Sequence, residues 1–561
     1  MRFKPTAVFA AALAVAGSVQ AQQATLALIN GKVWTENPAQ PQAQAVAVDG
    51  AVILAVGDTS TIRALIGAKT RVIDLHGRRV TPGFNDAHVH FVMGGDGAAS
   101  VQLGDAASAD EFRKRVGAFA KTRPKGAWLR NGFWDHQRWS PADLPTHQLI
   151  DDVTPDNPVL LWRMDGHTAL ANAAALRAAG IDATTPDPAG GEIVRDARGV
   201  PTGILKDSAT DLVGKVMPPL TPDEMDAAVT AAMAEAARHG VTSVQNMVLT
   251  PADPRGPDDI REFRKLERQG RLTVRIYAAV SLRGWKPLAQ SGITAPFGDP
   301  LLRIGSLKTF ADGALGSMTA WMDAPFVGHP DNLGLASVDL QHPDEMYAAL
   351  KGADKAGLQL VIHAIGTRAN HAILDFYERL EADNGPKDRR PRIEHAQHLR
   401  PDDIPRFAKL GVIASMQPYH AIDDGRWATG VIGPERSRYS YAWRSLLDNG
   451  AVLAFGSDWP VAPLDPLAGI YAATTRATFD GKNPDGWVPE QRITVGQAVH
   501  AYTVGSAYAE FQDKVKGSIE PGKLADLAVL SDDIFAIPPA DIAKTRVDIT
   551  VFDGRVIYQR R

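Results

Sequence analysis

The segment T-P-G-F-N-D-A-H-V-H, residues 81–90, is the most informative stretch of this 561-residue chain. It begins near a Pro-Gly pair, continues through a short apolar run and ends in two histidines separated by one residue. Because side chains alternate along a β-strand, His88 and His90 would point to the same side and could bind one metal ion together. The segment therefore predicts the end of a buried strand that carries metal ligands.

Apolar runs of strand length alternate with amphipathic helical patterns through the middle of the chain. Such alternation is typical of a parallel α/β fold, and eight parallel strands with helical crossovers close into a barrel. The expected strands are residues 83–89, 241–247, 273–281, 302–310, 358–364, 390–395, 411–416 and 451–457. We predict a (β/α)8 TIM-like barrel over residues 83–515, with an insertion at about 96–235 because this gap is too long for one crossover.

Both ends of the chain have the pattern of short strands joined by tight turns. Alternating apolar segments flank Asn30-Gly31, Asp49-Gly50 and Asp553-Gly554, and such dipeptides favour hairpin turns. Since chain termini often lie close together, we predict a small β-sandwich domain built from residues 22–82 and 516–561.

The composition narrows the classes of function. The net charge is −4 and no long basic run occurs, which argues against a nucleic-acid partner. The chain has no cysteine, so any metal ligands must be His, Asp, Glu or a modified Lys. We expect a small molecule as the partner. The oligomeric state stays open, with a homodimer as one option.

The first residues have the features of a secretory signal peptide. Two basic residues precede the apolar run Ala7–Ala16, and Val19-Gln20-Ala21 is a small-x-small cleavage site. No run reaches the ~18 uninterrupted apolar residues of a membrane helix. We predict a signal peptide over residues 1–21, a mature chain that begins near Gln22, and a periplasmic or secreted protein without a membrane span.

Polar residues stand at the C-terminal ends of several expected strands. In barrels of this kind the active site lies at that face, so these residues are candidate ligands. They are His88, His90, Lys308, His363, His395 and Asp458. Each one alone could be a core or loop polar residue, but the recurrence of the pattern indicates a shared metal site.

An ordered set of motifs carries a family resemblance. The motifs are P-G-F-N-D-A-H-V-H (82–90), G-F-W-D-H-Q-R-W (132–139), M-D-G-H-T-A-L-A-N (164–172), L-K-T-F-A-D-G-A-L-G-S (307–317), I-E-H-A-Q (393–397), F-G-S-D-W-P (455–460) and G-S-I-E-P-G-K-L-A-D-L (517–527). The chain resembles the amidohydrolase superfamily, and within it the amidohydrolase-3 family, which includes N-substituted formamide deformylases. The resemblance extends from about residue 24 to the C-terminus.

The resemblance implies two divalent metal ions. His88 and His90 would hold the more buried ion, and His363 and His395 would hold the second. A donor set of His and oxygen makes Zn²⁺ the first expectation, with Mn²⁺, Fe²⁺ and Co²⁺ as alternatives.

The resemblance also implies roles for Asp458 and Lys308. Asp458 would contact the first ion and shuttle protons, and Lys308 would carry a CO₂-derived carbamate that bridges the ions. A free ammonium group buried beside two cations would be unfavourable, which favours the carbamate. The alternative is that Lys308 stays a free amine, acting as a general base or pairing with Asp312.

The expected function is hydrolysis of a non-peptide C–N bond by a metal-activated hydroxide. Suitable substrates are an N-substituted amide, an N-acyl or N-formyl amine, or a cyclic amide. Ester or lactone hydrolysis by the same site is an alternative, because hydroxide attacks either carbonyl. A non-catalytic periplasmic binding protein is an alternative from another class.

Further residues are candidates for contact with the substrate. His167 could bind the substrate or polarise its carbonyl, or it could be a packing residue at a helix start. Trp134 and Asp135 would contribute an aromatic surface and a charge from the insertion, and Tyr419 would line the pocket after the seventh strand. Glu394 would face away from the barrel mouth, by strand alternation, and serve a structural role.

Overall fold

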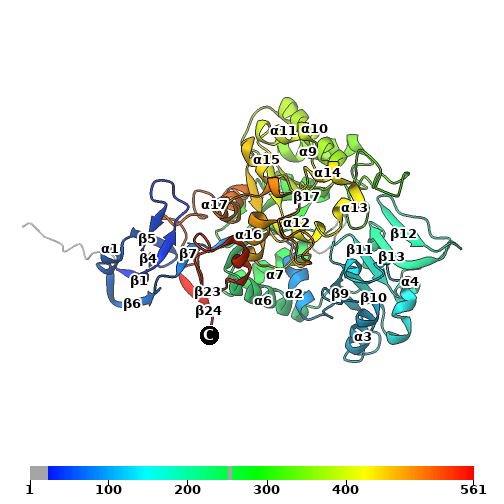
Figure 1. The fold of residues 1–561 in the computed structure, drawn as a ribbon, viewed down its shortest axis with the longest axis horizontal. Coiled ribbons are helices and arrows are strands. Elements are labelled where there is room, and N and C mark those ends of the chain that lie inside the picture. The colour runs from blue at the N-terminus through cyan, green and yellow to red at the C-terminus, as the bar shows by residue number, and fades with distance from the viewer. Residues whose placement is uncertain (1–22, 250–255) are drawn as a thin grey trace, which may run out of the picture.

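The computed structural model describes residues 23–249 and 256–561, and the predicted signal peptide lies outside them. Within the described residues, eight parallel strands form the central barrel (Figure 1). They are, in spatial order, β8 (Phe84–Val89), β14 (Val241–Asn246), β15 (Arg275–Ser281), β17 (Leu302–Phe310), β18 (Gln359–Ala364), β19 (Arg392–His395), β20 (Ile413–Met416) and β21 (Leu453–Phe455). A parallel bridge between Val89 and Trp459 joins the first strand to the segment after the last, so the barrel is nearly closed. The predicted (β/α)8 fold is confirmed.

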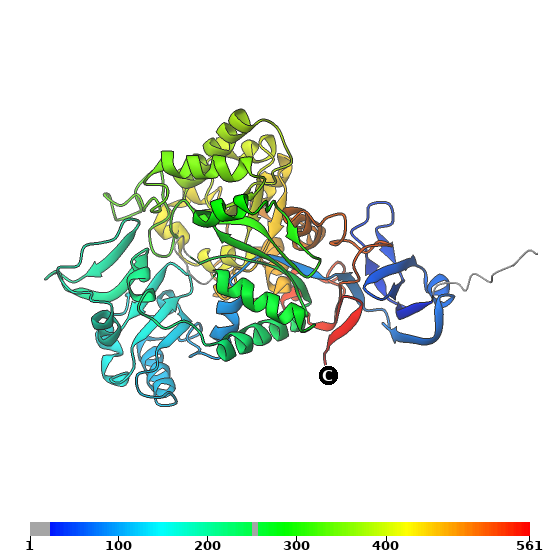
Figure 2. The same cartoon turned by 180° about the vertical axis from the view of Figure 1, so that it is seen from behind.

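Helices surround the barrel, as Figures 1 and 2 show from opposite sides. They are α2 (Phe91–Ala98), α6 (Pro222–Arg238), α7 (Gly256–Arg268), α8 (Trp285–Gln290), α9 (Pro343–Lys355), α10 (Thr367–Asn384), α11 (Ile404–Lys409), α12 (Pro418–Asp424), α13 (Ala428–Ile432), α14 (Pro434–Ser437), α15 (Trp443–Asp448), α16 (Pro466–Thr475), α17 (Val495–His500) and α18 (Ser506–Ala509). Helix α6 shows how the local sequence determines where a helix begins, because Thr221 and Glu224 form a capping box at its start. Its apolar side chains, such as Met225 and Val229, are buried in the core.

The region of the predicted insertion forms a separate sheet beside the barrel. The sheet has the order β12 (Gly191–Arg195), β13 (Pro201–Asp207), β11 (Thr168–Ala171), β10 (Val159–Arg163) and β9 (Leu129–Trp134). Helices α3 (Ala109–Ala120), α4 (Ala173–Ala178) and α5 (Thr210–Gly214) belong to the same region. Strand β11 begins directly after His167, so the sheet fixes the position of this residue.

The two ends of the chain build the β-sandwich, at the opposite end of the molecule from the insertion in Figure 1. One sheet has the order β5 (Val52–Gly57), β4 (Ala45–Asp49), β1 (Ala24–Ile29) and β6 (Ile66–Asp74), with α1 (Thr59–Arg63) beside it. The other has the order β24 (Arg555–Gln559), β23 (Val547–Phe552), β22 (Leu527–Leu530), β7 (Arg79–Pro82), β2 (Lys32–Trp34) and β3 (Gln42–Ala43). Since β22 pairs with β7, strands from both termini share one sheet, and the predicted sandwich is confirmed.

None of the helices in residues 23–249 and 256–561 combines the length and the apolar composition needed to cross a bilayer.

A buried ion-pair cluster ties the sandwich to the barrel. Arg275, at the start of β15, contacts Asp526 through Nε at 2.7 Å and Asp553 through Nη2 at 2.9 Å. Asp526 precedes β22, so the cluster links the barrel wall to the C-terminal strands.

Removal of the buried carboxylate should destabilise the protein. In Asp526→Ala the buried Arg275 guanidinium loses its closest partner, and we expect the free energy of unfolding to fall by about 3 kcal/mol. Calorimetric thermal unfolding measures this change. The exposed Arg555→Ala is the control, expected to stay within about 0.5 kcal/mol of wild type. Equal stability of the two variants would contradict the proposed role of the cluster.

Candidate metal centre

The predicted ligand residues converge at one end of the barrel. His88 lies in β8 and His90 directly follows that strand. Lys308 lies in β17, His363 in β18, and His395 ends β19. Asp458 follows β21 and is held against β8 by a hydrogen bond from its backbone N–H to the His88 carbonyl at 2.7 Å. All of these side chains are buried, and all line the same cavity.

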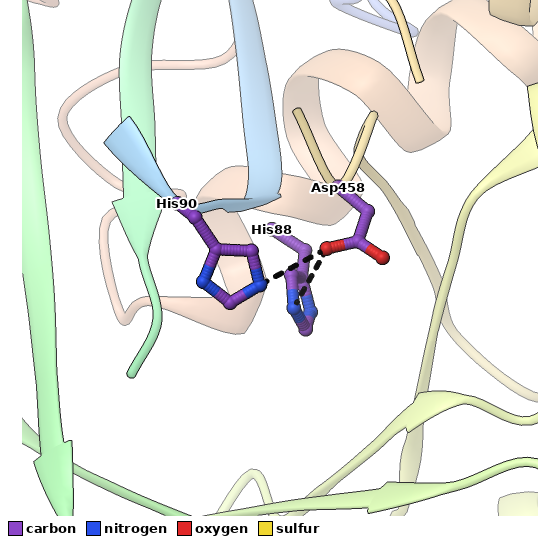
Figure 3. Close-up of side chains that lie close together, drawn as sticks. All are labelled: His88, His90 and Asp458. Carbon is purple, nitrogen blue, oxygen red and sulfur yellow. Dashed lines mark ion pairs between the residues drawn. The ribbon is translucent and has the colours of Figure 1, made fainter. Parts of the chain in front are cut away.

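Figure 3 shows the tightest part of this group. Asp458 Oδ1 lies 3.2 Å from His90 Nε2 and 3.5 Å from His88 Nε2. Ligand atoms placed about 2.0–2.1 Å from a tetrahedral ion would be about 3.3 Å apart, so the spacing matches a shared cation. Asp458 Oδ1 is buried and accepts no hydrogen bond from any residue that the structure describes.

Each of the four histidines uses one ring nitrogen to contact a protein acceptor. The contacts are His88 Nδ1 to Glu394 at 2.6 Å, His90 Nδ1 to the Met247 carbonyl at 3.1 Å, His363 Nε2 to the Gly313 carbonyl at 3.1 Å, and His395 Nδ1 to Gln417 at 2.8 Å. Metal-binding histidines characteristically donate their second N–H in this way. The other nitrogen of each ring is left with a lone pair available to a metal.

The histidines also form a continuous group. The ring centroids of His88 and His395 are 4.8 Å apart, and those of His363 and His395 are 4.4 Å apart. Burial lowers the pKa of these three rings well below the usual value, so they are neutral, which is the form that binds metals. The residues present therefore fit divalent cations.

Lys308 is also buried, with its Nζ 3.5 Å from His88 Nε2. Burial lowers the pKa of Lys308 to about 8 and so increases the fraction of neutral amine, the form that adds CO₂. The alternative pairing with Asp312 does not occur among the described contacts. The Asp312 carboxylate instead accepts backbone N–H groups from Ile365 and Gly366 at 2.9 and 2.7 Å.

Glu394 is not among the residues that line the cavity, and its role is to hold other side chains, as expected. Its carboxylate lies inside the barrel, where it accepts from His88 and pairs with Arg392 at 2.8 Å. The neighbouring His395 has a left-handed backbone with φ of 74°, so simple strand alternation does not hold at the end of β19. Glu394 therefore orients a candidate ligand.

Two further residues after β20 join the site, and of these Gln417 was not assigned to it from the sequence. Gln417, directly after β20, orients His395. The His420 ring is parallel to that of His395, and its Nε2 lies 3.9 Å from Asp458 Oδ2. The feature of the sequence that could have identified both residues is their position just after the expected strand 411–416.

His167 and Asp135 both line the cavity. The His167 ring centroid is 4.9 Å from that of His363, and its Nδ1 lies 2.7 Å from Asp207. Burial opposes the charged form of His167, but the Asp207 carboxylate outweighs it and raises the pKa. Asp135 pairs with Arg163 and Arg426, each at 3.1 Å.

The expectations for Trp134 and Tyr419 need correction. Trp134 is fully buried in the core of the insertion, packs against Phe112 and Trp139, and donates to a backbone carbonyl. Tyr419 is half-buried beside the exposed Phe479 and is not among the residues that line the cavity. An aromatic residue near a predicted mouth can serve packing as readily as recognition.

The cavity has about 780 Å³ of empty space, counted out to open solvent. Its wall also carries apolar side chains such as Leu249, Phe310 and Trp427. The arrangement brings a buried set of metal ligands to a pocket whose wall is partly polar and partly apolar.

Comparisons with known proteins agree with this geometry. A model of the amidohydrolase family matches residues 71–558. The protein LONG AFTER FAR-RED 3 of Arabidopsis thaliana is 38% identical over 545 residues, which cover 95% of this chain and 92% of that protein. The N-substituted formamide deformylase of Arthrobacter pascens is 28% identical, with 96% and 99% covered.

A solved structure is also similar. It is an uncharacterised metal-dependent hydrolase from Pyrococcus horikoshii OT3, with a TM-score of 0.74 and 27% identity. The match covers 92% of this chain and 99% of that one.

Gln417 provides a test of the metal centre. In Gln417→Leu the acceptor for His395 Nδ1 is lost, and we expect the affinity for one metal ion to fall about 10–100-fold. Metal content after equilibration with graded chelator concentrations measures this affinity. Gln417→Glu keeps an oxygen at the position and should retain an affinity close to that of the wild type. An unchanged affinity in Gln417→Leu would contradict the assignment.

Proposed function

The chain belongs to the amidohydrolase family, and from this premise we propose that it hydrolyses a non-peptide C–N bond in a small molecule. Suitable substrates are N-substituted amides, N-acyl or N-formyl amines, and cyclic amides. The relationship to an N-substituted formamide deformylase over nearly the whole chain supports this class of bond.

One observation carries the proposal. The Nδ1 atoms of His88 and His90 donate to protein acceptors, so their Nε2 lone pairs face Asp458 Oδ1 at 3.5 and 3.2 Å. Lys308 Nζ lies 3.5 Å from His88 Nε2, but Asp458 Oδ1 has no donor among the described residues. A buried carboxylate oxygen that faces ring lone pairs without a donor of its own is unfavourable. A divalent cation between these atoms would remove the conflict.

Two ions would complete the centre. His88, His90 and Asp458 would hold one, and His363 and His395 would hold the other, with a carbamate on Lys308 as the bridge. Zn²⁺ suits the His and oxygen donors, and Mn²⁺, Fe²⁺ or Co²⁺ would also be accepted. When bound, such ions supply Lewis acidity toward a carbonyl and lower the pKa of water.

The protein residues would manage the protons and the substrate. Asp458 accepts a proton from the attacking water and delivers it to the leaving nitrogen, so that an amide and water yield an acid and an amine. His167 contacts the scissile amide from the insertion side of the cavity. The paired charges of Asp135, Arg163 and Arg426 form a polar part of the wall.

Substrate turnover tests this proposal. The metal-loaded protein should carry about two ions per chain and release amine from members of a panel of N-acyl amines and hydantoin-like rings. His88→Ala should lower kcat/KM by about 10³-fold or more while the protein stays folded. His342→Ala, a change at an exposed histidine, is the control.

The outcomes separate the alternatives. Cleavage of esters or lactones without amides would favour the esterase alternative. A folded, well-supplied protein that binds no metal and turns over nothing would favour a binding protein. Unchanged turnover in His88→Ala would overturn the site assignment.

We also propose that the protein is exported. The basic, apolar and small-x-small segments of residues 1–21 support cleavage before Gln22. N-terminal mass spectrometry of protein from the periplasmic or secreted fraction should find a chain that begins near Gln22. An intact N-terminus on protein confined to the cytoplasm would contradict export.

A further inference from the structure

His167 and Asp207 form a pair on the insertion, at the edge of the metal-centre cavity. His167 Nδ1 lies 2.7 Å from Asp207 Oδ1. The backbone fixes the pair, because β11 and β13 are antiparallel and the Asp207 N–H donates to the His167 carbonyl at 2.7 Å. Both side chains are therefore held by the same sheet.

The Asp207 carboxylate lies close to Gly313, which is in the loop after β17. Asp207 has a left-handed backbone with φ of 48°, which is unfavourable for a residue other than glycine. A Cβ atom on Gly313 would lie 2.0 Å from Thr319 Oγ1 and 2.6 Å from Asp207 Oδ1, so a side chain there would collide with both groups. The Gly313 carbonyl accepts from His363 Nε2, and thus the same loop residue contacts a candidate metal ligand.

The ring of His167 faces the candidate ligands. Its centroid is 4.9 Å from that of His363, and the residue lines the cavity that contains all the predicted ligands. Whether the imidazole is neutral or charged, Nδ1 can carry the hydrogen that it donates to Asp207. Nε2 is then the nitrogen that remains for a molecule in the cavity.

We propose that Asp207 is a positioning residue that holds the His167 ring so that Nε2 contacts the scissile amide group of the substrate. The inference rests on the proposed C–N hydrolysis and deepens it. If Asp207 has this role, the insertion supplies residues that act on the substrate and does not only enclose the cavity. A side chain held by a carboxylate in this way loses less freedom when the substrate binds.

A double-mutant cycle on the metal-loaded full chain tests this role. With an amide that the wild type cleaves, Asp207→Ala should lower kcat/KM about 10²-fold, mainly through kcat, because the ring is misplaced. Asp207→Asn keeps an acceptor for Nδ1 and should recover most of the loss. His167→Ala should cost about 10²–10³-fold. Adding Asp207→Ala to His167→Ala should change little further, since Asp207 acts through the ring.

Two controls separate this role from a structural one. Metal content and the thermal midpoint should stay close to those of the wild type in each variant, and the exposed Asp143→Ala should leave kcat and KM unchanged. The same loss from Asp207→Ala with and without His167 would overturn the inference while leaving the proposed function in place. Failure of the metal-loaded wild type to cleave any amide would instead overturn the proposed function, and the inference with it.

Discussion

The buried pair of Arg392 and Glu394 is the interaction on which the metal centre depends. Both side chains are fully buried inside the barrel, where two arginine nitrogens contact the carboxylate at 2.8 and 3.0 Å. The same guanidinium donates to the Ala87 carbonyl at 2.7 Å and so connects β19 to β8. Glu394 is then fixed to accept from His88, whose Nε2 points toward Asp458. A buried charge of this kind persists only with such complete pairing.

The same kind of contact, between a histidine ring nitrogen and a protein acceptor, recurs throughout the site. A protein acceptor engages one nitrogen of every candidate histidine, so that ring rotation and tautomer are set before any metal arrives. Asp458 contributes a buried oxygen that no described residue satisfies. In the insertion, Asp207 engages one ring nitrogen of His167 in the same way, on the side of the cavity where we propose that the substrate binds. The barrel thus supplies rigid ligands, and a mobile substrate would meet a preorganised surface.

The sequence predicted the features that depend on local pattern. Apolar periodicity located the barrel strands, and His88 and His90 followed from strand alternation and from the rule that barrel sites lie at strand ends. Features that depend on backbone irregularity or distant contacts were missed. Arg392 and Glu394 share the interior side of β19, and the positive φ at His395 breaks the alternation at the strand end. Only the fold brings Asp207 to His167 across 40 residues. Trp134 was misplaced because an indole serves a core and a pocket equally well by composition.

Anomalous X-ray diffraction from crystals grown with Zn²⁺, recorded at the zinc absorption edge, tests the central claim most directly. The account predicts a strong peak about 2.0–2.2 Å from His88 Nε2, His90 Nε2 and an Asp458 oxygen. A second peak is expected between His363 and His395. A well-ordered crystal that places no zinc within coordinating distance of His88, His90 and Asp458 would contradict it.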